Sequence, residues 1–328
     1  MFWAAIGFVL LAPAAQAHHI TMRPGFFGHV VVDLAVSPWN GSSLYVAAFG
    51  QGIFVTHDGG SRWVPLRDGL SEKSVRGLAF GLRGRGEEGL LYLATDQGAF
   101  RKAPGLPWEP LPGLGERSVR ALRFLGKPSV LYAATEAGVF ASADGGLAWE
   151  ARNRGLAHLD VRALAAAPGR MYAGTFGGVF RSGDGGRTWR AASQGLTDPQ
   201  VRFLLAEPGA SGRLFAGTAL GGVFESRDGG GTWRAMNRGL VDSSVMSLAW
   251  ADGALLAGTR GGLFRLPPGG DAWHFVLVQR APLSMPAIAV GVSGRMYVSS
   301  GGEVYESRDG GKKWALLTPG APRRAAKQ

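Results

Sequence analysis

The sequence predicts an all-β protein, a seven-bladed β-propeller whose blades are four-stranded antiparallel sheets. Seven tryptophans recur at intervals of 40 to 45 residues and mark seven similar units. Each unit contains four short β-like runs separated by turn residues, and the chain holds 53 glycines. Four strands repeated seven times at this period are typical of a propeller, whereas a two-helix repeat would show a 3.6-residue periodicity and far less glycine.

The four runs of each unit follow in a fixed order. An apolar run such as "VRGLAF" comes first, and a run such as "LYVAA" or "MYAGT" comes second. The third run carries an aromatic residue eight or nine positions before the marker tryptophan, where the fourth run begins. We assign the propeller to residues 28–319, with blade 1 at 28–70 and blade 7 at 281–319. Because this array starts with an inner-type strand and ends with an outer-type strand, we expect no exchanged strand at the ring closure.

The two ends of the chain carry different signals. Residues 1–17 predict a signal peptide, because a short apolar core precedes the cleavage pattern Ala15-Gln16-Ala17, although no Lys or Arg stands before that core. Residues 18–27 form an N-terminal extension, and residues 320–328 a basic C-terminal tail. We therefore expect an exported protein, periplasmic or extracellular, whose signal is either removed or kept as an anchor. No later apolar stretch is long enough to span a membrane.

Five units share the pattern Ser/Thr-x-Asp-Gly-Gly-x-x-Trp, here called the Asp-Gly-Gly turn. An aspartate can accept hydrogen bonds from the backbone ahead of it, glycine can adopt positive φ, and tryptophan can pack between blades. We expect the turn to be structural rather than catalytic. Its aspartates are Asp58, Asp144, Asp184, Asp228 and Asp309, and its tryptophans are Trp63, Trp149, Trp189, Trp233 and Trp314. Blade 2 ("RKAPGLPW") and blade 6 ("RLPPGGDAW") have no matching aspartate.

This turn resembles the Asp-box, or BNR repeat, of the sialidase-like propellers. The resemblance implies the fold and a structural turn placed away from the functional face. It does not select one activity, because such propellers include sialidases, xyloglucan-type glycosidases, sorting-receptor ectodomains and photosystem II assembly factors. Single-propeller size, export and basic inner-strand starts make the photosystem II assembly-factor-like exported propellers the most similar subgroup, and that similarity implies a binding role.

Arginines recur at one position near the start of the inner strand. They are Arg76, Arg120, Arg162 and Arg202, in blades 2 to 5. Blade 6 has Met246 and blade 7 has Pro286 at this position. Four guanidinium groups on adjacent blades would form a positive arc at the channel mouth, suited to a carboxylate-rich peptide or an acidic sugar. Alternatively, each arginine pairs locally as a duplicated part of the repeat.

The turn after the second strand opens on the same face and is the most variable place in the repeat. It holds Phe49, Asp96, Glu136, Phe176, Leu220 and Arg260. We assign Phe49, Phe176 and Arg260 to ligand binding together with the arginine arc. Asp96 and Glu136 take equivalent places on neighbouring blades, so a glycoside hydrolase with paired carboxylates, or a polysaccharide-binding module, is the alternative. The run Thr95–Gly98 resembles a turn that carries a catalytic aspartate in xyloglucan-type enzymes.

Other function classes find little support. The chain has no cysteine, and its histidines are scattered over different repeat positions, so we expect neither a metal site nor a cofactor. All six tyrosines belong to the repeat, which leaves none for a sialidase nucleophile. The net charge of +11 suits an anionic partner, but stacking aromatics for nucleic acid are absent. We therefore expect a monomeric, non-catalytic assembly propeller that binds an acidic segment of an envelope or secreted protein, or an anionic glycan.

Overall fold

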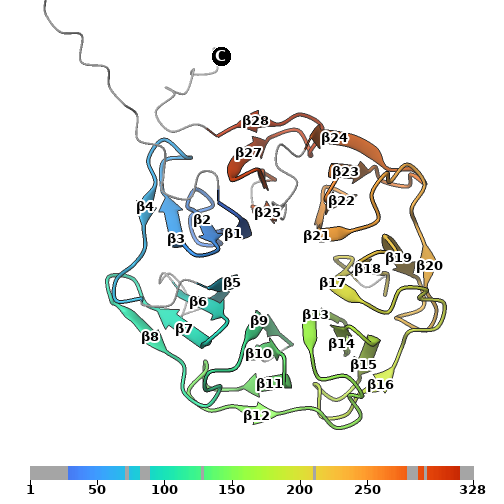
Figure 1. Ribbon diagram of the computed structural model, residues 1–328, viewed down its shortest axis with the longest axis horizontal. Coiled ribbons are helices and arrows are strands. Elements are labelled where there is room, and N and C mark those ends of the chain that lie inside the picture. The colour runs from blue at the N-terminus through green and yellow to red at the C-terminus, as the bar shows by residue number, and fades with distance from the viewer. Residues whose placement is uncertain are drawn as a thin grey trace, which may run out of the picture.

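The protein is a seven-bladed β-propeller, as the sequence predicts (Figure 1). The computed structural model describes residues 29–70, 74–81, 89–126, 129–209, 212–278, 287–291 and 294–317. The expected signal peptide, N-terminal extension and C-terminal tail lie outside the described residues. Each sheet consists of four consecutive antiparallel strands, so the described strands include no exchange between blade 7 and blade 1. Within the described ranges, no helix has the length and apolarity that crossing a membrane requires.

The first two strands of each blade lie nearest the centre of the ring (Figure 1). The inner strands are β1 (Val31–Val36), β5 (Val75–Gly81), β9 (Val119–Leu125), β13 (Val161–Ala167), β17 (Val201–Ala206), β21 (Val245–Ala251) and β25 (Ile288–Val290). The second strands are β2 (Leu44–Ala48), β6 (Leu90–Thr95), β10 (Val130–Thr135), β14 (Arg170–Thr175), β18 (Leu214–Thr218), β22 (Ala254–Thr259) and β26 (Met296–Ser300). The second strands are mostly buried on both faces, because neighbouring blades pack against each side of them.

The third and fourth strands complete each blade toward the rim. The third strands are β3 (Gly52–Thr56), β7 (Gly98–Lys102), β11 (Gly138–Ser142), β15 (Gly178–Ser182), β19 (Val223–Ser226), β23 (Gly262–Leu266) and β27 (Glu303–Ser307). The outer strands are β4 (Val64–Pro65), β8 (Trp108–Pro110), β12 (Glu150–Ala151), β16 (Arg190–Ala191), β20 (Arg234–Ala235), β24 (His274–Val278) and β28 (Ala315–Leu316). This order places the inner-strand starts and the turns between second and third strands on one face. The turns between third and fourth strands lie on the other.

The hydrophobic core lies between blades rather than within them. Residues of β1, β2 and β3 pack with residues of β25, β26 and β27 across the ring closure, where Leu317 is also buried. Marker tryptophans join neighbouring blades as well. The indole N–H of Trp189 donates to the backbone carbonyl of Arg152, and that of Trp233 donates to the carbonyl of Ala192, each at 2.8 Å. The ring is therefore held by packing between blades and, at blades 4 and 5, by a hydrogen bond from the marker tryptophan to the blade before it.

The Asp-Gly-Gly turn of blade 4 shows how these turns are held. Asp184 Oδ1 accepts hydrogen bonds from the backbone N–H of Thr188 at 2.9 Å and from the hydroxyl of Ser182 at 2.7 Å. The Ser182 oxygen in turn accepts the N–H of Gly186, which has a φ of 83°. Hydrogen bonds from the Thr188 hydroxyl and N–H hold the pKa of Asp184 well below its ordinary value. The carboxylate is thus engaged by its own turn.

Candidate functional site

Each arginine of the predicted arc is the extra residue of a β-bulge. The inner strand pairs with the second strand on both sides of Arg162, at Val161 and Ala163, while the residue between them is skipped. The same shift skips Arg76, Arg120 and Arg202. A bulge bends the strand and re-aims the side chain at the extra position. The repeated bulge therefore explains why arginines of four blades point toward one face.

In blade 2, Arg76 is paired within its own blade. Its Nε and Nη2 donate to the two carboxylate oxygens of Asp96 at 2.8 and 2.6 Å. Ser118 of blade 3 also donates its hydroxyl to Asp96 at 2.7 Å, and the Nη1 of Arg120 lies 3.7 Å from the same carboxylate. Asp96 therefore binds Arg76 with a two-pronged ion pair and links blades 2 and 3.

An aspartate that the sequence analysis missed pairs with the next arginines. Asp160 accepts two hydrogen bonds from Arg162, at 3.1 and 2.6 Å, and lies 3.7 Å from the Nε of Arg120. Residues two apart on a strand share a face. The residue two before each arginine could therefore have been examined as its ion-pair partner. That position is Ser74, Ser118, Asp160 and Gln200 in blades 2 to 5, and Asp160 is its only acid. Alternating charges thus run from Arg76 to Arg162.

Two buried atoms in this charged row make no hydrogen bond with any described residue. They are the Nε of Arg120 and the Oδ1 of Asp160, which face each other across 3.7 Å. Buried polar groups in proteins are usually hydrogen-bonded, and exceptions concentrate at sites with a role beyond stability. The row is therefore tightly paired at both ends and loosely paired at its centre.

The predicted aromatic residues Phe49 and Phe176 contact the arginines. The guanidinium of Arg76 lies 5.2 Å from the centre of the Phe49 ring, and that of Arg162 lies 4.2 Å from the Phe176 ring. Both distances are within the range of a cation–π contact. Both phenylalanines remain partly exposed. They present an apolar surface beside cations whose charge is already balanced by Asp96 and Asp160.

The arginines of blades 5 and 6 differ from the others in their partners. Arg202 donates to the Sδ of Met246 at 3.1 Å and approaches the Ser244 hydroxyl at 3.5 Å, and it makes no ion pair within the described ranges. Burial lowers the pKa of Arg202, and repulsion from Arg260 and Arg162 lowers it further, against the attraction of Asp198. Arg260 is exposed and, among the described residues, also lacks an ion pair. At this end of the arc, neither arginine is ion-paired with a carboxylate among the described residues.

Blades 5 and 6 also carry exposed apolar side chains in loops at the arginine face. Leu220 is 71% exposed and Val241 is 81% exposed. Asp198, the nearby acid, accepts the backbone N–H groups of Leu220 and Gly221 at 2.7 and 2.8 Å, so its carboxylate holds the turn. We call Arg202, Leu220, Val241 and Arg260 the blade 5–6 patch.

The sequence pattern placed Leu220 at the turn position of Asp96 and Glu136, but Ala219 occupies that position in blade 5. Ala219, rather than Leu220, donates its N–H to the residue two before the inner-strand arginine, as Asp96 and Glu136 do in their blades. The turn therefore contains one inserted residue. That insertion extends Leu220 into solvent.

The two candidate catalytic carboxylates have different surroundings. Burial alone would raise the pKa of Asp96, but hydrogen bonds from Arg76 and Ser118 and the charges of Arg76 and Arg120 hold it below its ordinary value. Glu136 is exposed and accepts the backbone N–H of Ser118 at 3.2 Å. A glycosidase needs one carboxyl that stays protonated as a general acid, and Asp96 is unsuited to that role. Within the described residues, no three His, Asp or Glu side chains cluster to hold a metal ion.

Comparison with known proteins relates this chain to others by fold. No family model and no curated protein matches it. An ancestral GH74 enzyme has a TM-score of 0.69 and 16% identity over 88% of this chain and 46% of its own. The extracellular domain of a putative hybrid two-component system from B. thetaiotaomicron has a TM-score of 0.69 and 18% identity over 84% and 38%. YCF48 bound to D1 peptide has a TM-score of 0.62 and 14% identity over 92% and 95%.

These similarities establish the fold alone, because every identity is low. This chain spans less than half the length of the GH74 enzyme and of the sensor domain, whereas it matches nearly the whole of YCF48. The propeller fold is therefore shared with a hydrolase, an extracellular sensor and a peptide-bound protein.

Proposed function

We propose that this protein is an exported, non-catalytic assembly propeller that binds an acidic segment of another envelope or secreted protein. The observation that carries the proposal is the blade 5–6 patch, where Arg202 and Arg260 have no carboxylate partner among the described residues. A partly buried arginine that repels two other arginines favours an added anion, since the anion relieves that repulsion. A carboxylate ligand supplies the charge that Asp96 and Asp160 supply elsewhere in the arc.

The apolar members of the patch define the rest of the ligand. Leu220 and Val241 expose large hydrophobic surfaces in loops of the same two blades, on the same face as the arginines. A segment that alternates acidic and apolar side chains would place carboxylates on Arg202 and Arg260 and apolar groups on Leu220 and Val241. A uniformly charged glycan would leave those two side chains uncovered. An acidic protein segment therefore fits better than an anionic glycan.

Two comparisons support the proposal. YCF48, the neighbour that this chain covers nearly end to end, was solved with a bound peptide. The sensor neighbour is an extracellular domain, which agrees with the export signal expected at residues 1–17. We also propose that the Asp-Gly-Gly turns are Asp-box repeats, given that their carboxylates are engaged within their own turns.

The test compares two double variants that remove the same charge. In Arg202→Gln/Arg260→Gln the patch loses both cations, whereas Arg181→Gln/Arg190→Gln removes two cations from the rim of blade 4. Each protein captures partners from envelope extract at low salt, and the captured segment is then synthesised and titrated. We expect the patch variant alone to lose the partner, and wild-type affinity to fall as salt rises. Equal capture by both variants would refute the proposal.

A glycoside hydrolase using Asp96 and Glu136 is the second candidate function. The GH74 neighbour favours it, as do the equivalent turn positions of the two carboxylates on adjacent blades. The ion pair of Asp96 with Arg76 weighs against it. Xyloglucan hydrolysis by the wild type, abolished in both Asp96→Asn and Glu136→Gln, would establish this activity. If the wild type does not hydrolyse xyloglucan, the hydrolase candidate is rejected and the binding function is retained.

A further inference from the structure

The turn between the third and fourth strands normally covers a tyrosine of the preceding blade. Where the Asp-Gly-Gly turn is complete in blades 3, 4 and 5, that tyrosine donates its hydroxyl to a glycine carbonyl of the turn. The pairs are Tyr92 with Gly145, Tyr132 with Gly185 and Tyr172 with Gly229, each at 3.1 Å. All three tyrosines are buried as a result.

Blade 2 replaces this turn with Ala103–Pro107 and leaves a groove beside blade 1. Tyr45 stands at the position of the covered tyrosines but is only half-buried. It lines a cavity of about 650 Å³ together with the replacement loop. The groove therefore lies where other blades pack a complete turn. It opens on the face opposite the arginine arc, so it is separate from the proposed binding site.

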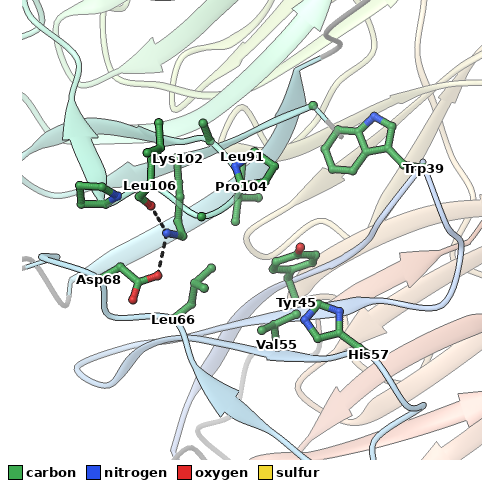
Figure 2. A pocket seen from close by; sticks show the side chains of 14 residues that line it. Trp39, Tyr45, Val55, His57, Leu66, Asp68, Leu91, Lys102, Pro104 and Leu106 are labelled. Carbon is green, nitrogen blue, oxygen red and sulfur yellow. Dashed lines mark hydrogen bonds and ion pairs between the residues drawn. The ribbon is translucent and has the colours of Figure 1, made fainter. Parts of the chain in front are cut away.

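The walls of the groove are aromatic on one side and formed by the replacement loop on the other. Figure 2 shows Trp39, Tyr45 and His57 of blade 1 facing Lys102 and Leu106 of blade 2. Both Trp39 and Tyr45 make edge-to-face contacts with Phe80, at 5.1 and 5.5 Å between ring centres. These contacts hold the two rings in place, so the aromatic wall is formed before any ligand binds.

The charges that line the groove are balanced. Lys102 takes the place of the serine in the Asp-Gly-Gly turn and is 8% exposed. Its ammonium donates to the carbonyl of Leu106 and pairs with Asp68 at 2.7 Å (Figure 2). The groove is lined by no other Lys, Arg, Asp or Glu within the described residues. The bond to Leu106 holds the loop, and the ion pair with Asp68 leaves the groove without net charge from these groups.

Polar atoms remain at the edge of the groove. The Asp68 side chain is about half exposed, and the Nδ1 of His57 lies 2.7 Å from the Ser43 hydroxyl, which orients the imidazole ring. A hydrocarbon ligand would bury these polar groups without hydrogen bonds, at a cost in free energy. A strongly charged ligand would find no counter-charge. The surface instead matches a ring with an apolar C–H face and a hydroxyl-bearing edge.

We infer that this groove binds a neutral sugar, as one or two rings of an oligosaccharide. Sugar C–H groups would lie against the negative faces of Trp39 and Tyr45, and hydroxyls would hydrogen-bond with Asp68 and His57. The cavity volume falls within the range of small-ligand sites. The site belongs to blades 1 and 2 and needs neither Arg202 nor Arg260.

The experiment uses a filled groove and a matched control. Leu106→Trp places an indole at the mouth of the groove, and Leu147→Trp places it at the same turn position of blade 3, two residues before the marker tryptophan. The two leucines are 51% and 52% exposed, so neither change disturbs the core. Binding of cellobiose, maltose and chitobiose is measured by saturation-transfer NMR, with digalacturonic acid as the charged comparison.

We expect the wild type and Leu147→Trp to bind at least one neutral disaccharide with a Kd of about 1 mM, and Leu106→Trp to bind it at least tenfold more weakly. His57→Ala, an exposed change, should also weaken binding. The inference is overturned if no neutral disaccharide binds the wild type, if Leu106→Trp binds as well as Leu147→Trp, or if digalacturonic acid binds more tightly than the neutral sugars.

Discussion

At the scale of single residues, equivalent arginines have different chemical roles. Arg76 binds both carboxylate oxygens of Asp96, and Arg162 donates two hydrogen bonds to one oxygen of Asp160. Arg202 instead contacts a methionine sulfur and a serine hydroxyl. The backbone position is the same in each blade, so the difference comes from the neighbours. An acid in the second-to-third turn or two residues before the arginine balances its charge. Blade 5 has an alanine and a glutamine at those places.

The paired half of the arc should depend on pH. The folded-state pKa of Asp96 is lowered, so its ionised form contributes stability above the ordinary aspartate pKa, and that stability is lost as pH falls through the folded pKa. We expect Asp96→Asn to lower the free energy of unfolding by about 1 kcal/mol at neutral pH, and by less in acid.

Urea unfolding at neutral pH and near pH 3 measures this difference. Asp271→Asn serves as the control, because Asp271 pairs with Arg238 on the open surface, where an ion pair contributes little. A deficit in Asp96→Asn that is the same at both pH values would show that the Arg76–Asp96 pair is not its source.

At the scale of elements, two features recur among the blades: the bulge in the inner strand and the Asp-Gly-Gly turn. The inner-strand bulge of blades 1 to 6 aims one side chain toward one face. The Asp-Gly-Gly turn lies on the opposite face. The bulge occurs at all four arginines and also at Met246 of blade 6, so it does not require an arginine. The backbone therefore sets the direction of the side chain, and its identity sets the chemistry.

The Asp-Gly-Gly turn should depend on its serine as much as on its aspartate. Ser182 is buried, and its oxygen accepts the N–H of Gly186 while its hydroxyl donates to Asp184. Ser182→Ala leaves a buried N–H without an acceptor, so we expect a loss of about 1–3 kcal/mol in the free energy of unfolding. Chemical denaturation measures the loss, with the exposed Ser42→Ala as reference. Equal stability of the two variants would contradict this role.

The sequence predicts these elements unevenly. The tryptophan register and the glycine turns are local, so they specify strand order and blade number. The pairing of Asp96 with both Arg76 and Ser118 spans two blades and depends on their packing. Asp160 could have been found from strand alternation. The groove at Tyr45 could not be predicted from local patterns, because it depends on packing between blades. A complete turn in blade 2 would cover Tyr45 of blade 1, and blade 2 lacks that turn.

At the scale of the whole molecule, the ring is closed by side-chain packing. Leu317 follows the outer strand of blade 7 and packs into the cluster that joins β1 and β2 to β26 and β27. A side chain at Gly60 of blade 1 would clash with it, which shows how closely the two ends of the array meet. The first and last blades therefore depend on each other.

Weakening this closure should destabilise the propeller. Leu317→Ala removes a buried side chain at the seam, and we expect the free energy of unfolding to fall by about 2–5 kcal/mol. Leu316→Ala, at a partly exposed position next to it, should change stability by less than about 1 kcal/mol. Urea unfolding measures both. If the two variants lose equal stability, Leu317 does not close the ring.

The central claim is that positive charge is balanced in blades 2 to 4 and available in blades 5 and 6. The most direct measurement is a titration of ¹⁵N-arginine-labelled protein with acetate, a free carboxylate, followed through the side-chain Nε–H NMR signals. Single Arg→Lys variants assign those signals. The account predicts that acetate shifts the signals of Arg202 and Arg260 and leaves those of Arg76 and Arg162 in place. Equal shifts at all four arginines, or shifts at Arg76 and Arg162 alone, would contradict it.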